Sequence, residues 1–326
     1  MKVLLLGSSG LLGHNVLQRL VVDGHKVVAL VRRADFIRLP LNGFEIKTGS
    51  LSDTGTLIAA AEGCDAIVNC AGVTDMSLLH RTDYDEINCR LCERLVETAT
   101  YHGIRTLVHT STVNTIGYGS PTEPADEQAQ MMSPFTESWY AASKHDGENI
   151  ILNYARQHAD SCHFVVINPG YMIGPMDVKP SSGRLLLAAY RRPVMLAPKG
   201  GKAVVDVRDV AGAVISALTH GQNGQRYITV NSHGHLTIKE LYQLQAQTMG
   251  YRQRIVELPN CLLTTAGVVG DVLRAAGART ELSTRNVRQL MVRENYSNHH
   301  AIKDLGLTET PIEEAIKDFY KWRETH

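Results

Sequence analysis

Short apolar runs alternate with helix-type periodicity through the first half of the chain, and no other feature limits the fold as strongly. The runs are mostly apolar on both faces and are Val3–Leu6, Val27–Val31, Phe44–Lys47, Ala66–Cys70, Thr106–His109 and His163–Ile167. Strands with two apolar faces are typical of a parallel sheet that helices cover on both sides. Between the runs, Leu12, Val16 and Leu20 recur at helical spacing. The pattern predicts an α/β fold with a doubly wound parallel sheet, whose ligands bind at the carboxyl ends of the strands.

A glycine-rich turn follows the first of these runs directly, between the expected strand and the first amphipathic helix. Glycines there permit a tight turn and close approach of the backbone to a pyrophosphate, and the helix amino terminus offers N–H groups to it. Because strand, turn and helix stand in the required order, we favour dinucleotide binding over a plain turn, and a sheet of the Rossmann type. The expected cofactor contacts in this turn are Gly7, Ser9, Gly10, Leu11, Leu12 and Gly13.

The second strand ends in Arg32 and Arg33, where a site that prefers NAD usually carries an acid for the ribose 2′-hydroxyl. Two guanidinium groups can instead pair with a 2′-phosphate. We therefore expect NADP(H) as the preferred cofactor, with NAD(H) as the alternative if both arginines are solvated loop residues.

The rhythm of strands and helices changes after about Pro169, where prolines and glycines punctuate a loop-rich stretch. One further strand and helix, residues 203–207 and 209–219, are expected to return to the first layer. Helical patterns at 238–249 and 312–322 indicate a smaller second lobe. We predict a dinucleotide-binding domain over residues 1–175, with 202–220 returning to it, and a mostly C-terminal substrate-binding lobe from 176–201 and 221–326.

Tyr140 and Lys144 lie four residues apart at the start of a helical stretch, so both side chains can face one cleft. A nearby cation stabilises a phenolate, and a tyrosine whose pKa is lowered in this way exchanges protons efficiently near neutral pH. Thr110, Ser111 and Thr112 follow the strand at 106–109 directly, at the edge where a hydroxyl could bind the same substrate oxygen. Taken singly, such a pair is usually a surface pair and such a run is usually a turn.

Together these motifs resemble the extended short-chain dehydrogenase/reductase superfamily, also called the NAD-dependent epimerase/dehydratase superfamily. The resemblance covers essentially the whole chain. It implies that Tyr140 is the general acid/base, and that Lys144 lowers its pKa and holds the nicotinamide ribose. It also implies that Thr112 orients the substrate carbonyl, because Thr112 stands five residues before Gly117; Ser111 is the alternative.

The same resemblance implies further cofactor contacts. These are the adenine-contacting pair Ser50 and Leu51, the phosphate and ribose segment Cys70, Ala71 and Gly72, and the nicotinamide-side loop Pro169 and Gly170. An aspartate is usual in the family where Ser50 stands. Asn88 matches a helix asparagine near the active site, although it could equally be a helix-surface residue.

Two reaction classes use this scaffold: reductases that consume NADPH, and nucleotide-sugar epimerases or dehydratases that recycle a bound NAD. Residues 197–211 are similar to the dihydroflavonol reductase-like subgroup. Epimerases generally place an arginine seven residues before the position of Asp209, where this chain has Lys202. We therefore expect a short-chain reductase or dehydrogenase acting on a ketone or aldehyde. The alternatives are a nucleotide-sugar epimerase or dehydratase and a non-catalytic NADP(H)-sensing protein.

Composition limits the partners of the chain. The 326 residues carry 33 basic and 33 acidic side chains, which argues against nucleic acid and favours a small carbonyl or alcohol substrate. Six dispersed cysteines indicate reduced thiols and a cytoplasmic protein, and Cys89 and Cys92 are interpreted as packing residues, so no metal site is expected. Family members often dimerise through the helices that hold Asn88 and Tyr140, so a homodimer is a further expectation.

No stretch has the roughly 20 uninterrupted apolar residues that a membrane span needs. The closest stretch, 262–276, is interrupted by four polar or charged residues. It predicts an amphipathic helix that covers a cleft, with contact to a membrane surface as the alternative.

Overall fold

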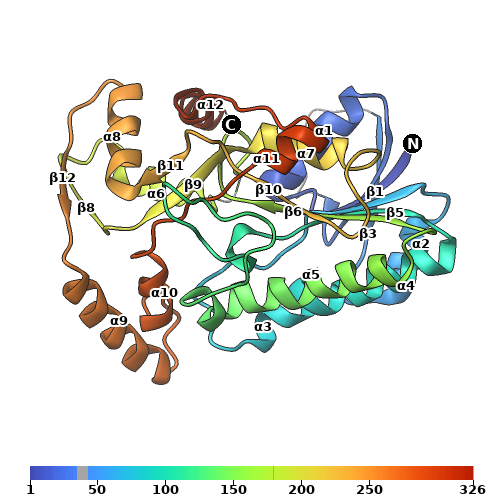
Figure 1. Cartoon of the computed structure of the whole chain (residues 1–326), viewed down its shortest axis with the longest axis horizontal. Coiled ribbons are helices and arrows are strands. Elements are labelled where there is room, and N and C mark those ends of the chain that lie inside the picture. Colours follow the sequence, from blue (N-terminus) through green and yellow to red (C-terminus); the bar gives the residue numbers. More distant parts are fainter. Residues whose placement is uncertain (35–42, 179, 326) are drawn as a thin grey trace.

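A parallel sheet forms the centre of the protein (Figure 1), in a computed structural model that describes residues 1–34, 43–178 and 180–325. It has seven strands in the order β10-β6-β5-β4-β1-β2-β3, so the order reverses direction between β1 and β4. All neighbours in it are parallel. The predicted doubly wound Rossmann sheet is confirmed. The strands are β1 (Lys2–Leu6), β2 (Lys26–Val31), β3 (Phe44–Thr48), β4 (Ala66–Asn69), β5 (Thr106–Thr110), β6 (His163–Pro169) and β10 (Arg226–Thr229).

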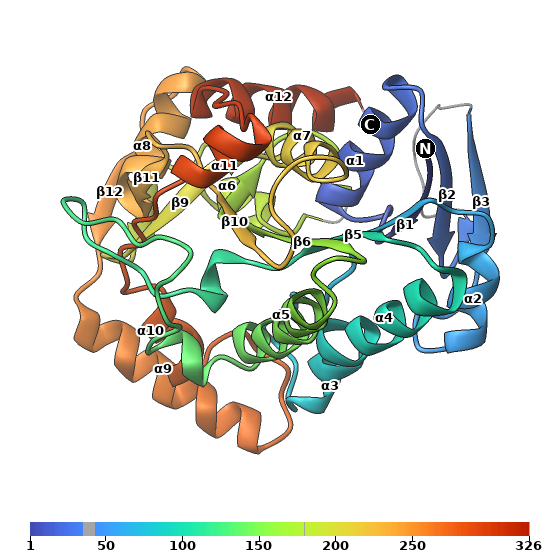
Figure 2. The ribbon, with the colours of Figure 1, turned by 45° about the vertical axis from the view of Figure 1, so that its right-hand side comes forward.

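Helices cover both faces of this sheet (Figure 2). Strand β1 shows why: Val3 and Leu5 join one core cluster, whereas Leu4 and Leu6 join the other. Both faces of a central strand are therefore removed from water, as its continuous apolar run predicted. The first cluster takes in α1 (Leu11–Val22), α7 (Val207–Ser216) and α11 (His299–Leu305), and the second takes in α2 (Thr54–Ala61), α4 (Leu91–His102) and α5 (Trp139–Gln157).

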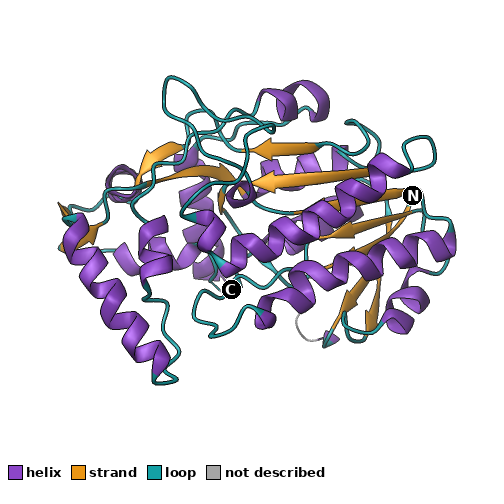
Figure 3. Ribbon diagram, turned by 60° about the horizontal axis from the view of Figure 1, so that its bottom comes forward, coloured by secondary structure: helices purple, strands orange, loops and turns teal. Residues whose placement is uncertain are grey.

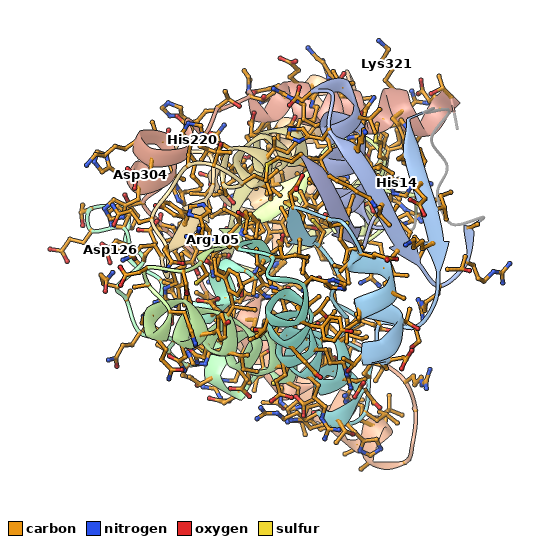
Figure 4. The ribbon with its side chains drawn as sticks, turned by 90° about the vertical axis from the view of Figure 1, so that its right-hand side faces the viewer. His14, Arg105, Asp126, His220, Asp304 and Lys321 are labelled. Carbon is orange, nitrogen blue, oxygen red and sulfur yellow. The ribbon has the colours of Figure 1, made fainter. Side chains whose placement is uncertain are left out.

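Glycines with a left-handed backbone end two of these helices. Gly24 follows α1 with a φ of 79°, and Gly103 follows α4 with a φ of 66°. Side chains fill the layers on each side of the strands, as Figure 4 shows for the layer of α1 around the labelled His14. His14 is buried, and its ring contacts the carbonyl of Gly10 at 3.1 Å.

The second lobe contains two small sheets, with the orders β11-β9-β7 and β12-β8. Its strands are β7 (Tyr171–Ile173), β8 (Val194–Ala197), β9 (Gly201–Asp206), β11 (His235–Thr237) and β12 (Arg254–Glu257). Its helices are α6 (Gly183–Ala189), α8 (Ile238–Thr248), α9 (Asn260–Ala275), α10 (Thr284–Gln289) and α12 (Ile312–Thr325). In Figure 3, short strands and several helices lie at the end of the molecule opposite the amino terminus.

Two elements lie elsewhere than expected. The strand predicted near residues 203–207, observed as β9, pairs with β7 and β11 and not with the large sheet, although the helix that follows it, α7, does pack on α1. Strand β10 falls in the range expected for the second lobe, yet it pairs with β6 at the edge of the large sheet. The predicted boundaries between the two lobes therefore stay a proposal.

The helix predicted at 262–276 is observed as α9, but its large apolar side chains are not the ones that it buries. Its buried residues are the glycines Gly267 and Gly270, where a Cβ atom would lie 2.7 and 2.3 Å from atoms of Val287 and Leu282. Its large apolar residues Leu262, Val268, Val269, Val272 and Leu273 are exposed. Small residues thus let α9 approach α10 closely, and the side of α9 near its end borders a cavity described below.

Candidate active site

The turn between β1 and α1 has room for a phosphate where a dinucleotide would need it. A Cβ on Gly7, whose φ is 78°, would lie 2.5 Å from the backbone of Cys70 and Ala71, and a Cβ on Gly13 would lie 2.0 Å from the carbonyl oxygen of Gly7. Gly10 is different: it is exposed, and its Cβ would meet protein only at 3.5 Å. Packing therefore requires glycine at 7 and 13, while Gly10 leaves open space at the amino terminus of α1.

Helix α1 begins with neither a side-chain cap nor an acidic residue in its first turn. Its first N–H groups, including those of Leu11 and Leu12, and its positive dipole end therefore favour an anion approaching past Gly10 and Ser9. These residues fit the pyrophosphate of a dinucleotide.

The segment after β4 is fixed by side chains from the neighbouring strands. The N–H of Ala71 donates to Asn69 Oδ1 at 3.0 Å, and Asn69 Nδ2 donates to His109 Nδ1 at 3.0 Å. A Cβ on Gly72 would lie 3.5 Å from Lys144 Nζ. The predicted cofactor segment and the predicted catalytic lysine are thus neighbours.

The other predicted cofactor residues lie at the carboxyl ends of their strands. Arg32 and Arg33 are exposed directly after β2, and Ser50 is exposed after β3, where its Oγ accepts from the N–H of Ser52 at 3.2 Å. Leu51 packs against the core cluster that includes α2.

Pro169 ends β6, and the N–H of Gly170 donates to Thr229 O at 3.0 Å. A Cβ on Gly170 would lie 2.2 Å from Ala203 O, so glycine is required where the large sheet meets the second lobe.

Tyr140 and Thr112 meet at this edge of the sheet. Tyr140 is the second residue of α5, which Ser138 caps by accepting from the N–H of Ala141 at 3.4 Å. Thr112 follows β5, and its hydroxyl lies near the phenol of Tyr140. Burial raises the pKa of Tyr140, and the nearby Thr112 side chain opposes that rise. The alternative hydroxyl, that of Ser111, is buried and has no hydrogen-bond partner among the described residues.

Lys144 lies one helical turn further along α5 and is buried. Its Nζ donates to the carbonyl oxygen of Thr110 at 2.6 Å, and burial lowers the pKa of its ammonium. The sequence predicted a lowered pKa for Tyr140. In the structure this pKa is raised, because burial of the phenol outweighs the other causes. Lys144 nevertheless lies beside the predicted cofactor segment at Gly72 and on the same helix as Tyr140.

Asn88, whose role the sequence left open, lies beside the predicted active-site residues. It is fully buried in a short π-helix, Glu86–Arg90, where its Oδ1 accepts from the N–H of Val73 at 2.8 Å and its Nδ2 donates to Ser143 Oγ at 3.0 Å. Asn88 therefore ties the segment after β4 to helix α5.

Glu148 is a buried residue that sequence reasoning missed. Its carboxylate accepts from Thr115 Oγ1 at 2.8 Å, Asn168 Nδ2 at 2.9 Å and Arg226 Nη1 at 3.0 Å. It lies four residues after Lys144 on the same face of α5, and this spacing was the available signal. The network holds α5 against the ends of β5, β6 and β10.

Lys202, where a nucleotide-sugar epimerase generally has an arginine, forms an ion pair with Glu294. The Lys202 side chain is 15% exposed and that of Glu294 is 2% exposed. The charge of Lys202 is thus already balanced inside the protein.

Over residues 1–34, 43–178 and 180–325, no group of three or more histidine, cysteine or acidic side chains could hold a metal ion, and no helix has the length and apolar character of a membrane span. All six cysteines are free, and Cys92 is buried in the packing expected for it.

Comparison with known proteins agrees with this geometry. The model of the NAD dependent epimerase/dehydratase family matches residues 3–231. A Synechocystis protein whose name likens it to dihydroflavonol 4-reductase is 28% identical, over 98% of this chain and 94% of its own. Sterol demethylase protein B of Methylococcus capsulatus is 27% identical, over 99% and 98%.

Among solved structures, that of gox2253 superposes with a TM-score of 0.83 at 25% identity, covering 99% of this chain and 98% of the other. A UDP-glucose 4-epimerase from Thermotoga maritima, with UDP-glucose, superposes at 0.78 with 18% identity, covering 100% and 99%, a likeness of fold alone. The match of the family model over more than half of the sequence establishes that this chain belongs to the NAD dependent epimerase/dehydratase family.

Proposed function

We propose that the protein is an NADP(H)-dependent reductase that reduces a ketone or aldehyde of a small organic substrate. The observation that carries the proposal is the neighbouring pair of Tyr140 and Thr112, with Lys144 beside the expected cofactor segment at Gly72. This arrangement offers a proton donor and a second hydroxyl to one substrate oxygen. The name of the Synechocystis relative, which likens it to dihydroflavonol 4-reductase over nearly the full chain, agrees with it.

Each residue has a defined part in this mechanism. A bound nicotinamide dinucleotide supplies the hydride to the carbonyl carbon. Thr112 orients the carbonyl oxygen by a hydrogen bond, and the phenol of Tyr140 gives its proton to that oxygen. The Lys144 ammonium stabilises the phenolate that results and holds the nicotinamide ribose. Glu148 and Asn88 act indirectly, because their hydrogen bonds fix α5 and the segment after β4.

The cofactor preference rests on Arg32 and Arg33. Both are exposed at the end of β2, and neither is an acid that would select a ribose 2′-hydroxyl. We expect NADPH to bind more tightly than NADH, and Arg32→Ala and Arg33→Ala each to weaken NADPH binding about tenfold with little effect on NADH. Fluorescence titration measures both affinities, and equal affinities in the parent protein would remove the preference.

The ion pair of Lys202 with Glu294 favours a reductase over a nucleotide-sugar epimerase. A lysine whose charge is balanced by a buried carboxylate is a poor partner for a substrate diphosphate.

The proposal also includes a homodimer formed through the helices that hold Asn88 and Tyr140.

Net consumption of NADPH separates the reaction classes. The protein is incubated with NADPH and a panel of aromatic and aliphatic ketones and aldehydes, and in a parallel reaction with UDP-glucose and NAD. We expect a carbonyl compound to be reduced with one NADPH oxidised per alcohol formed. Epimerisation of UDP-glucose without net cofactor consumption would replace the proposal with the epimerase, and tight NADPH binding without turnover would replace it with a sensing role.

A further inference from the structure

A cavity of about 900 Å³ opens beside the start of α5, apart from the catalytic residues themselves. Figure 1 shows α9 and α10 next to that end of α5, and the ion pair between Glu137 and Arg288 joins the turn just before α5 to α10 there. The cavity walls include Trp139 of α5, His80 after β4, Arg274 of α9 and Arg285 of α10. Four separate parts of the chain therefore converge on it.

Arg285 is the unusual group in this cavity. Its guanidinium lies 3.7 Å from the centroid of the Trp139 ring and is only partly exposed. Within the described residues this guanidinium makes no hydrogen bond or ion pair. Burial and the nearby charge of Arg274 lower the pKa of Arg285. A partly buried arginine whose five donors lack partners is rare, because desolvation of a charge is costly unless hydrogen bonds offset it.

The other charged groups around the cavity already have partners. Arg274 donates to the carbonyl oxygens of a turn after β4 and of Thr280, at 3.1 Å for Ser77 and 2.6 Å for Thr280. Asp271 accepts from the N–H of Thr284 at 3.2 Å, and Glu137 is taken by Arg288. Arg285 is therefore the cation in this cavity that a ligand can engage.

Two segments of the chain that line the cavity also contribute residues to the proposed site of reduction. Trp139 directly precedes Tyr140 on α5. His80 belongs to the segment that begins at Gly72, beside Lys144. A substrate whose carbonyl group reaches Tyr140 would have to extend along these two segments to meet Arg285.

We propose that Arg285 and Trp139 form a subsite for the carboxylate of the substrate, which would then be an organic acid that also carries a ketone or aldehyde. A carboxylate matches the flat, two-pronged guanidinium, whose face stays stacked on the indole. The single negative charge of a carboxylate balances the positive charge of Arg285. A phosphate dianion would be repelled more strongly by the carboxylates of Asp271 and Glu137. This substrate class rests on the proposed reductase function.

Binding of simple acids tests the subsite without any turnover. Calorimetric titrations compare 2-naphthoate with the neutral 2-naphthamide and with inorganic phosphate, in the parent protein, in Arg285→Gln and in Arg279→Gln. Arg279 is an exposed arginine two residues after Gly277, which lines the same cavity, and it serves as the matched control. A charged hydrogen-bonded pair of this kind corresponds to about 10- to 150-fold in affinity. We expect the parent and Arg279→Gln to prefer the acid over the amide by at least about tenfold, and Arg285→Gln to lose that preference.

Equal binding of acid and amide in the parent, a preference that survives in Arg285→Gln, or tighter binding of phosphate than of 2-naphthoate would each overturn the subsite. Thermal unfolding shows whether Arg285→Gln is folded. The proposed reduction is tested separately: for oxo acids compared with their methyl esters, Arg285→Gln should raise KM for the acids and leave kcat and the ester KM unchanged. Absence of turnover with every carbonyl compound would remove the reductase function while the binding titration still reports on the subsite.

Discussion

The proposed catalytic edge of the parallel sheet and the cavity in front of α10 differ in how their charged side chains are hydrogen-bonded. At the catalytic edge, Lys144 donates to Thr110 O, and Glu148 accepts hydrogen bonds from three side chains. In the cavity, the guanidinium of Arg285 stacks on Trp139 and makes no hydrogen bond within the described residues. In the proposed function, the chain therefore fixes the groups assigned to chemistry by its own hydrogen bonds, and the hydrogen bonds of the group assigned to substrate recognition would be completed by the ligand.

The largest expected effect comes from breaking the catalytic network. Glu148→Ala removes a buried carboxylate and leaves Arg226 and Asn168 without their shared acceptor. Removing one partner of a buried ion pair typically costs about 3–5 kcal/mol, so the free energy of unfolding should fall by that order. Urea unfolding measures it. Glu97→Ala, at an exposed position on α4, is the control and should change stability by less than about 0.5 kcal/mol. A small loss in Glu148→Ala, similar to the control, would show that the network does not hold the site.

A smaller loss of stability is expected when the pH is lowered. His109 is fully buried next to Asn69, and burial, with the charge of Lys144 as a lesser cause, holds its pKa well below the ordinary value. Below about pH 6.5 the unfolded chain takes up a proton that the folded chain does not, so stability falls as the pH falls towards the folded pKa.

This group alone contributes a slope of up to about 1.4 kcal/mol per pH unit in that window. Urea unfolding between pH 7.5 and 5.5 should therefore show a steeper loss in the parent protein than in His109→Gln, because the other histidines contribute equally to both. Parallel curves for the two proteins would mean that His109 is protonated in the folded state.

The smallest effect is expected at the cavity. Arg285→Gln loses the stacking on Trp139, worth about 0.5–1 kcal/mol, but also removes a partly buried cation that Arg274 repels. The free energy of unfolding should therefore change by less than about 1 kcal/mol, in contrast to Glu148→Ala. A loss of several kcal/mol would show that Arg285 holds the fold together, and the contrast between the two regions would fail.

Local patterns predicted the parts of the structure that depend on neighbours in sequence. The apolar runs predicted six strands of the large sheet, and the four-residue spacing placed Tyr140 and Lys144 on one helix. Strand β10 was misplaced because its four residues include the polar Arg226 and Thr229, and its partner β6 lies about 60 residues earlier. Hydrophobic periodicity contains no information on such a long-range pairing.

The same limit applies to the site. Glu148 could have been found from its helical spacing with Lys144, but its partners Thr115 and Arg226 come from distant strands and turns. The stacking of Arg285 on Trp139 joins residues that lie 146 positions apart. Arg285 belongs to the second lobe, where the sequence offers no motif. Such contacts depend on how the second lobe packs, which a local pattern does not specify.

The most direct test of the proposed reaction follows the hydride. NADPH that carries deuterium at C4 of the nicotinamide, on each face in separate reactions, is incubated with the carbonyl compound that the panel selects. One of the two should transfer deuterium to the carbinol carbon of the product, with one NADPH oxidised per alcohol, and Tyr140→Phe should lower this rate by about 10²- to 10⁴-fold. An unchanged rate in Tyr140→Phe, or product formed without deuterium and without net loss of NADPH, would contradict the proposed function.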